Sequence, residues 1–135
     1  MVKAVFSTKT DPVEAVAEIK SKIQQDPKAV VYFVSSSFDQ SAIAQGMLQS
    51  FPTAQLIGCS TSGEIVSGSM LKNGLVVMTL NEDVIEFADI EVISNLESKD
   101  SVNAAFTLFE RKLGCSISEL DITKYVGLAL IDGLS

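Results

Sequence analysis

Three small-residue segments carry the side chains of this chain that could do chemistry. Each follows an apolar run: "SSSFD" spans residues 35–39, "GCSTSGE" spans residues 58–64 and "DGLS" spans residues 132–135. Serine and threonine hydroxyls both donate and accept hydrogen bonds, and glycine lets backbone amides approach a ligand closely. Glu64 and Asp132 add carboxylates that could hold an amine. These segments indicate a site for a small polar molecule, although turn residues that bond only their own backbone would have the same composition.

Catalytic motifs fit these segments poorly. Gly58 and Gly63 have the spacing of a phosphate-binding loop, but Glu64 stands where that loop has lysine and would repel phosphate. The chain has no histidine, so it cannot form a Ser-His-Asp or Cys-His pair by itself. A nucleophilic Cys59 or Ser60 is the alternative, yet no basic residue lies near Cys59 in sequence to activate it. We therefore expect no enzyme and no cofactor.

Composition restricts the class of protein. The 135 residues are 47% hydrophobic and 20% charged, which predicts one globular domain over residues 1–135. The net charge of −7 argues against nucleic acid and anionic membranes as partners, because both need basic patches. Cys59 and Cys115 form no metal-binding spacing, and we expect both to be reduced. No signal peptide and no apolar run of about 18 residues are present, so a cytoplasmic location is expected.

The elements that must position the small-residue segments alternate between strands and helices. Buried or alternating apolar runs predict strands, and stripes of apolar residues with capping residues predict helices. Strands are expected at 2–7, 29–36, 54–60, 74–80, 84–93 and 125–131, and helices at 11–25, 39–50 and 98–114. The runs 74–80 and 84–93 would form a hairpin. This β-α-β-α-β-β-β-α-β order predicts an α/β fold with a mixed, mostly parallel sheet and helices packed on it.

Parallel strands would bring the three segments to one edge of that sheet. Ligands of open α/β sheets bind at the carboxyl ends of the strands. We expect the loop at residues 58–68 to follow a central strand and to lie beside the other two segments. The candidate ligand-binding residues are Ser35, Ser36, Gly58, Cys59, Ser60, Thr61, Gly63, Glu64, Asp132 and Gly133.

The same segments resemble a known family. "VVYFVSSSFD", "AQLIGCSTSGEI", "NGLVVMTL" and "VGLALIDGLS" look like the N-terminal FIST domain, and the similarity covers nearly all of residues 29–135. Its most specific part is "IGCSTSGEI", with "DGLS" as a second anchor. The resemblance implies a sensory domain of a prokaryotic signal-transduction protein that binds small ligands such as amino acids. Family members usually continue beyond this point, so it also implies the N-terminal part of a larger domain.

Partners follow from the resemblance and from the end of the chain. A C-terminal companion domain or a downstream signalling protein would receive the signal. The apolar run 126–131 is expected inside the sheet, where the helix that should follow it is missing. An uncovered apolar face or open edge favours self-association. We therefore expect a homo-oligomer, and a structural dimerisation module is a further alternative to ligand binding.

Overall fold

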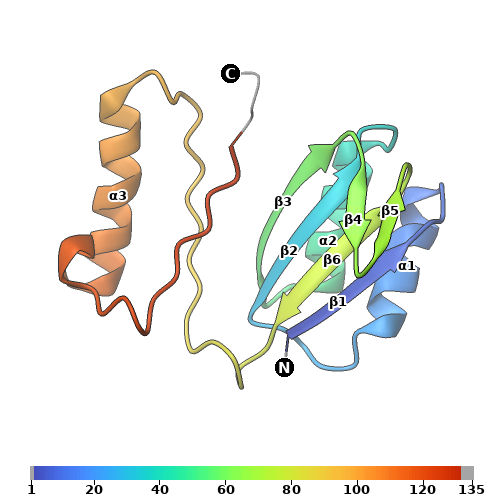
Figure 1. Cartoon of the computed structure of the whole chain (residues 1–135), viewed down its shortest axis with the longest axis horizontal. Coiled ribbons are helices and arrows are strands. Elements are labelled where there is room, and N and C mark those ends of the chain that lie inside the picture. Colours follow the sequence, from blue (N-terminus) through green and yellow to red (C-terminus); the bar gives the residue numbers. More distant parts are fainter. Residues whose placement is uncertain (1, 132–135) are drawn as a thin grey trace. The chain divides into compact units, whose positions relative to one another are not determined.

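The computed structural model describes residues 2–131, which divide into two compact units, one up to Ala88 and one from Asp89 onward. The first unit contains a four-stranded sheet, two helices and a small hairpin (Figure 1). Its elements in chain order are β1 (Val2–Ser7), α1 (Pro12–Lys22), β2 (Ala29–Ser35), α2 (Gln40–Ser50), β3 (Gln55–Thr61), β4 (Glu64–Val66), β5 (Ser69–Leu71) and β6 (Leu75–Leu80).

The sheet has the strand order β1-β6-β2-β3. β2 and β3 are parallel and are joined by α2, whereas β6 runs antiparallel to both β1 and β2. The α/β class is confirmed, but the pairing is less parallel than expected, because β6 inserts between β1 and β2. β3 was expected to be central and is instead an edge strand.

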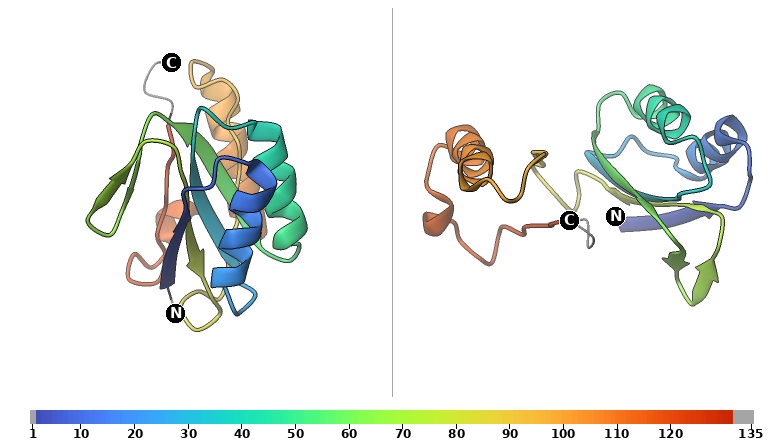
Figure 2. Two further views of the ribbon diagram at one scale, coloured as in Figure 1. Left: turned by 90° about the vertical axis from the view of Figure 1, so that its right-hand side faces the viewer. Right: turned by 90° about the horizontal axis from the view of Figure 1, so that it is seen from above.

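Helices α1 and α2 cover one face of the sheet, and the hairpin of β4 and β5 projects from the other (Figure 2). The Asp11 carboxylate accepts a hydrogen bond from the Glu14 amide and caps α1. The Asp39 carboxylate accepts from the amides of Ser41 and Ala42 and caps α2 in the same way. Between the helices and the sheet lies a core of Val5, Ala15, Val16, Ile19, Ile23, Val30, Val34, Phe38, Ile43, Met47, Phe51, Leu75 and Val77.

The second unit contains α3 (Lys99–Leu113) and a short 3-10 helix, η1 (Ile117–Glu119). The Ser98 hydroxyl accepts from the Ser101 amide at the start of α3, and Gly114 ends the helix in the left-handed conformation with φ 75°. This helix and its end at Gly114 were expected. The Lys112 ammonium donates to Asp89 and Glu91, each at 2.8 Å. Only Ala105 of α3 is buried, so most of the predicted apolar stripe stays partly exposed.

Two expected strands are wrong. Residues 84–93 form no strand, because β6 is bonded to β1 on one side and β2 on the other, which leaves no place for a hairpin partner. Residues 125–131 have no regular structure and are largely exposed, with Val126 at 96%. A strand needs a neighbour for its backbone groups, and no other described strand pairs with this run.

The expected loop at residues 58–68 is also wrong. Gly58 to Thr61 belong to β3, and the remainder forms the hairpin of β4 and β5. Ser67 and Gly68 make its two-residue turn, with φ of 28° and 86°. Positive φ at both positions matches the right-handed twist of a hairpin. It also explains why the sequence has glycine at position 68.

Candidate functional site

The carboxyl ends of β2 and β3 bring two of the three small-residue segments together. The Ser36 amide donates to the Thr61 carbonyl at 3.0 Å, and Ser35 is paired with Thr61 across the two strands. This edge was the expected meeting point of the segments at 35–39 and 58–64. The third segment, with Asp132 and Gly133, lies outside the described residues.

Ser35, the last residue of β2, forms its side-chain hydrogen bonds within the chain. Its buried hydroxyl lies 3.0 Å from the Ser37 hydroxyl and donates to the Lys72 carbonyl at 3.3 Å. Ser36 is exposed. Gly63 is exposed at the turn into β4, and no positive φ requires glycine at that position. These three residues therefore lie at the edge of the sheet where β2 and β3 end.

The buried carboxylate of Glu64 joins β3 to the start of β6. Its side chain is 2% exposed. One oxygen accepts from the Thr61 hydroxyl at 2.8 Å and the other accepts from the Gly74 amide at 3.1 Å. Each carboxylate oxygen therefore has a partner inside the chain. Glu64 and Thr61 hold the end of β3 in place.

Gly58 lets an aromatic ring lie flat on β3. It pairs with Tyr32 of β2, and a Cβ atom at position 58 would stand only 2.3 Å from the Tyr32 ring. An aromatic residue that covers a cross-strand glycine in this way shields the exposed backbone. Gly58 thus gives Tyr32 the space to extend over the strand toward α2.

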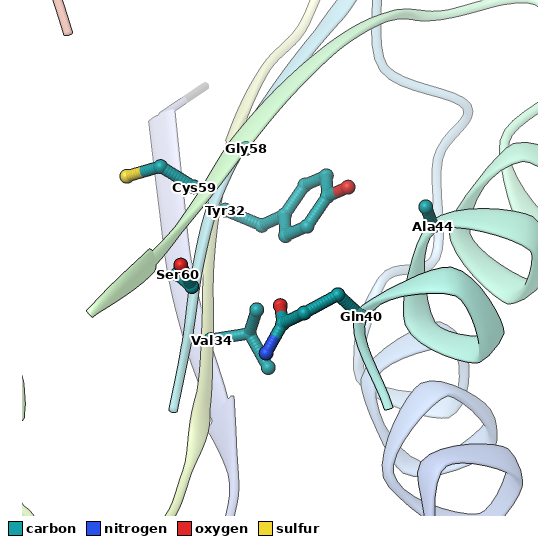
Figure 3. Close-up of a pocket in the computed structure, with 7 residues that line it drawn as sticks. All are labelled: Tyr32, Val34, Gln40, Ala44, Gly58, Cys59 and Ser60. Atoms are coloured by element: carbon teal, nitrogen blue, oxygen red, sulfur yellow. The ribbon is translucent and has the colours of Figure 1, made fainter. Parts of the chain in front are cut away.

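A cleft lies between α2 and the strands β2 and β3. Its volume is about 240 Å³. In Figure 3 the Tyr32 ring extends from β2 toward Ala44, and the Gln40 amide extends from α2 toward Val34. Gln40 donates to the carbonyls of Ser35 and Phe38, each at 3.1 Å, which fixes its side chain. The cleft is lined by Tyr32, Val34, Gln40, Ala44, Gly58, Cys59 and Ser60.

The polar side chains of this cleft are uncharged, and several of their hydrogen-bond donors and acceptors are not used within the described chain. Among the described residues, neither the Tyr32 hydroxyl nor the Ser60 hydroxyl makes a hydrogen bond. Burial, with a smaller effect of the nearby Cys59, raises the pKa of Tyr32, so this hydroxyl keeps its proton at neutral pH. The Gln40 amide nitrogen is used within the chain, whereas its oxygen is left to accept. The side chains of the cleft can therefore both donate hydrogen bonds to a ligand and accept them from it.

The Cys59 thiol points away from this cleft. In Figure 3 its sulfur lies on the opposite side of β3 from the Tyr32 ring and the Gln40 amide. Burial raises the pKa of the thiol, which disfavours the nucleophilic thiolate. Both Cys59 and Cys115 are free. The geometry gives Cys59 no polar partner with which to act as a nucleophile.

The predicted site and the observed cleft overlap at Gly58, Cys59 and Ser60. Sequence reasoning missed Tyr32, Gln40 and Ala44. Tyr32 carried a usable signal, because a tyrosine inside an apolar strand brings a hydroxyl that must find a partner or water. Gln40 and Ala44 have no such signal in the sequence. They line the same cleft as Ser60 only because α2 crosses over β2 and β3.

Two further observations concern the described part of the chain. Nowhere in residues 2–131 do three or more metal-ligating side chains gather in one place. The longest described helix, α3, has 15 residues, and none of the helices in that range combines the length and apolarity needed to cross a bilayer.

Comparison with known proteins identifies the family of this chain. None of the curated proteins compared with this chain matches it. The family model of the FIST N domain matches residues 28–135, from the residue before β2 to the last residue of the sequence. The matched part includes both strands of the cleft, helix α2 and the Gly58–Glu64 segment. Because the match spans well over half of the residues, this chain belongs to the FIST N domain family, whose members are sensory domains of signal transduction.

Proposed function

We propose that this chain is a ligand-binding sensory domain and that the cleft between α2 and β3 is its binding site. The observation that carries the proposal is the set of available polar groups in the cleft, above all the unbonded hydroxyls of Tyr32 and Ser60. Polar groups in a concave site that are not used by the protein itself are the ordinary means of orienting a ligand.

The size and charge of the cleft suit a small neutral or zwitterionic molecule such as an amino acid. Its volume of about 240 Å³ is below the roughly 300–1,000 Å³ typical of pockets for drug-sized ligands. No side chain of Asp, Glu, Lys or Arg lines it. In this proposal the Ser60 hydroxyl donates to a carboxylate, and the Gln40 oxygen and Tyr32 hydroxyl accept from an ammonium group.

The remaining candidate residues support the cleft. Ser35, Ser36, Thr61, Gly63 and Glu64 form the adjoining sheet edge, and we propose that Asp132 and Gly133 contribute to the same ligand site. The chain passes the signal to a companion domain or a downstream signalling protein in the cytoplasm. It acts by binding and not by catalysis, because Cys59 points out of the cleft and its thiol pKa is raised by burial.

A thermal-shift screen of the twenty amino acids and related metabolites tests the proposal. A ligand at about one hundred times its Kd should stabilise the chain by roughly 2.7 kcal/mol. Hits are then titrated by calorimetry against Tyr32→Phe, which removes one hydroxyl and keeps the ring. The lost hydrogen bond should weaken binding by about twofold to tenfold.

A matched pair of variants localises the site. Ala44→Leu fills the cleft and should abolish binding. Gln45→Leu introduces the same side chain at the next, exposed position of α2 and should leave binding unchanged. The proposal is wrong if no compound binds, or if a ligand binds Ala44→Leu as tightly as the original chain.

A further inference from the structure

The strand β3 presents an unpaired row of backbone groups. Its pairing with β2 is anchored at both ends, where the Gln55 amide donates to the Lys28 carbonyl at 2.9 Å and the Thr61 carbonyl accepts from Ser36. Backbone groups alternate between the two sides of a strand. The N–H and C=O groups of Leu56, Gly58 and Ser60 therefore point to the open side, where no described strand pairs with them.

The two edges of the sheet differ in their protection. At β1 the Lys22 ammonium donates to the Phe6 carbonyl at 2.6 Å, and Lys3 of the strand donates to the Lys22 carbonyl. Lysines on an edge strand discourage pairing with another chain. β3 reads QLIGCST and carries no charged residue and no proline over its seven residues. Of the two sheet edges formed by the described residues, only that of β3 carries no lysine.

We propose that β3 of a second copy of this chain pairs antiparallel with β3 around a twofold axis at Gly58. This register pairs the whole strand, because Gly58 is its middle residue. Gly58 would lie opposite Gly58 of the partner subunit, and Leu56 would lie opposite Ser60 of the partner subunit. Each outward-pointing residue would then exchange both of its backbone hydrogen bonds with its opposite residue.

Charge favours a second copy as the occupant of this edge. The chain as a whole carries −7, but this strand is neutral, so two copies bring no like charges together at the interface. Repulsion between the more distant charges is screened beyond about 8–10 Å at physiological salt. A strand that pairs with its own copy forms a closed interface, as a twofold dimer requires.

The pairing would also change the cleft. Leu56, Gly58 and Ser60 share the face of β3 that α2 covers, since side chains alternate along a strand. Leu56 of the partner subunit would therefore stand beside Ser60 and close the open side of the cleft. The inference does not rest on ligand binding, since the backbone pairing is the same with an empty cleft.

Light scattering of the purified chain, from tens to hundreds of micromolar, tests the proposal. We expect twice the monomer mass. Ser60→Pro removes an outward N–H and leaves the bonds to β2, which come from the alternate residues, so it should yield a monomer. Ser60→Lys should raise the dimer dissociation constant by about tenfold or more, because it places a charge on the open edge. Circular dichroism checks that both variants stay folded.

Two controls separate this interface from others. Ser62→Lys makes the same charge change just beyond β3, at an exposed position, and should remain dimeric. Leu128→Lys alters the exposed run 125–131 and should also remain dimeric. The inference is overturned by a monomeric original chain, by a dimer that survives in both Ser60 variants, or by a dimer that Leu128→Lys alone dissociates.

Discussion

At the scale of single residues, Glu64 shows how a plausible ligand group becomes a structural one. It has the charge to hold an amine, and it follows a small-residue run that resembles a binding loop. In the fold it is buried and both oxygens accept hydrogen bonds, from the Thr61 hydroxyl and from the Gly74 amide. Its contribution is therefore to the position of β3, on which the cleft depends.

Replacing Glu64 should destabilise the fold. Glu64→Ala leaves the buried Gly74 amide without an acceptor, which costs about 1–3 kcal/mol. Glu64→Gln should cost less, because its carbonyl oxygen can still accept from one donor and the Thr61 hydroxyl can rotate to accept from the new amide. Urea unfolding measures both free energies. Equal stability of Glu64→Ala and the original chain would contradict the structural role.

The Cys59 thiol should react slowly with alkylating reagents. Burial raises its pKa, so less thiolate is present at neutral pH than in a free cysteine. The rate of iodoacetamide labelling at pH 7, measured by mass spectrometry in Cys115→Ser, should be lower than that of free cysteine. A faster rate would revive the hypothesis that Cys59 is a nucleophile.

At the scale of elements, the contact between β1 and α1 depends on one carboxylate. The Ser7 hydroxyl and the Lys22 ammonium donate to the two oxygens of Glu18, at 2.6 and 2.7 Å. Lys22 also donates to the Phe6 carbonyl. These bonds connect the last turn of α1 to the end of β1 and to the edge that the lysines protect.

The contribution of Glu18 should depend on pH. The hydrogen bond from Lys22, followed by that from Ser7, lowers the pKa of Glu18 from its ordinary value of about 4.3. The ionised form is therefore favoured in the fold, and its stabilisation is complete above about pH 5 and is lost as the pH falls through the lowered pKa. Glu18→Gln should reduce the loss of melting temperature between neutral and acidic pH.

The matched control for this prediction is Glu82→Gln. Glu82 is exposed and forms no ion pair within the described residues. This substitution removes the same charge and should keep the acid dependence of the original chain. A similar acid dependence in Glu18→Gln and Glu82→Gln would show that the Glu18 contacts do not stabilise the fold.

At the scale of the whole molecule, burial is distributed unevenly between the two units. β2 and β6 contribute Val30, Val34, Leu75 and Val77 to the core of the first unit. The second unit buries Ala105 of α3, and its last residues, 125–131, are mostly exposed. Segments with few buried contacts open at low free energy.

Hydrogen exchange should follow this distribution. The amides of β6 and β2 should exchange most slowly, because each of these two strands is bonded to a strand on both sides. Residues 125–131 should exchange almost at the rate of an unfolded peptide, since they have no strand partner in the described structure. Mass spectrometry of the exchanged chain measures both. Protection of residues 125–131 equal to that of β6 would contradict the exposed conformation.

The sequence by itself determined the elements whose signals are local. Asp11 and Asp39 cap their helices as expected, since a cap needs only the next few residues. The apolar runs of β2 and β6 were recognised because burial on both faces removes the alternation of polar residues. The α/β class and the meeting of the segments at 35–39 and 58–64 followed from the order of these elements.

The tertiary structure alone decided which strands are neighbours. Residues 84–93 have the composition of a strand, but their expected hairpin partner β6 is bonded on both sides, and no described strand pairs with residues 125–131. β3 lies at the edge because, among the described residues, only β2 pairs with it, and the cleft lies beside α2 next to this edge strand. A cleft lined by residues distant in sequence, such as Gln40 and Ser60, leaves no local pattern, so only the packed fold could reveal it.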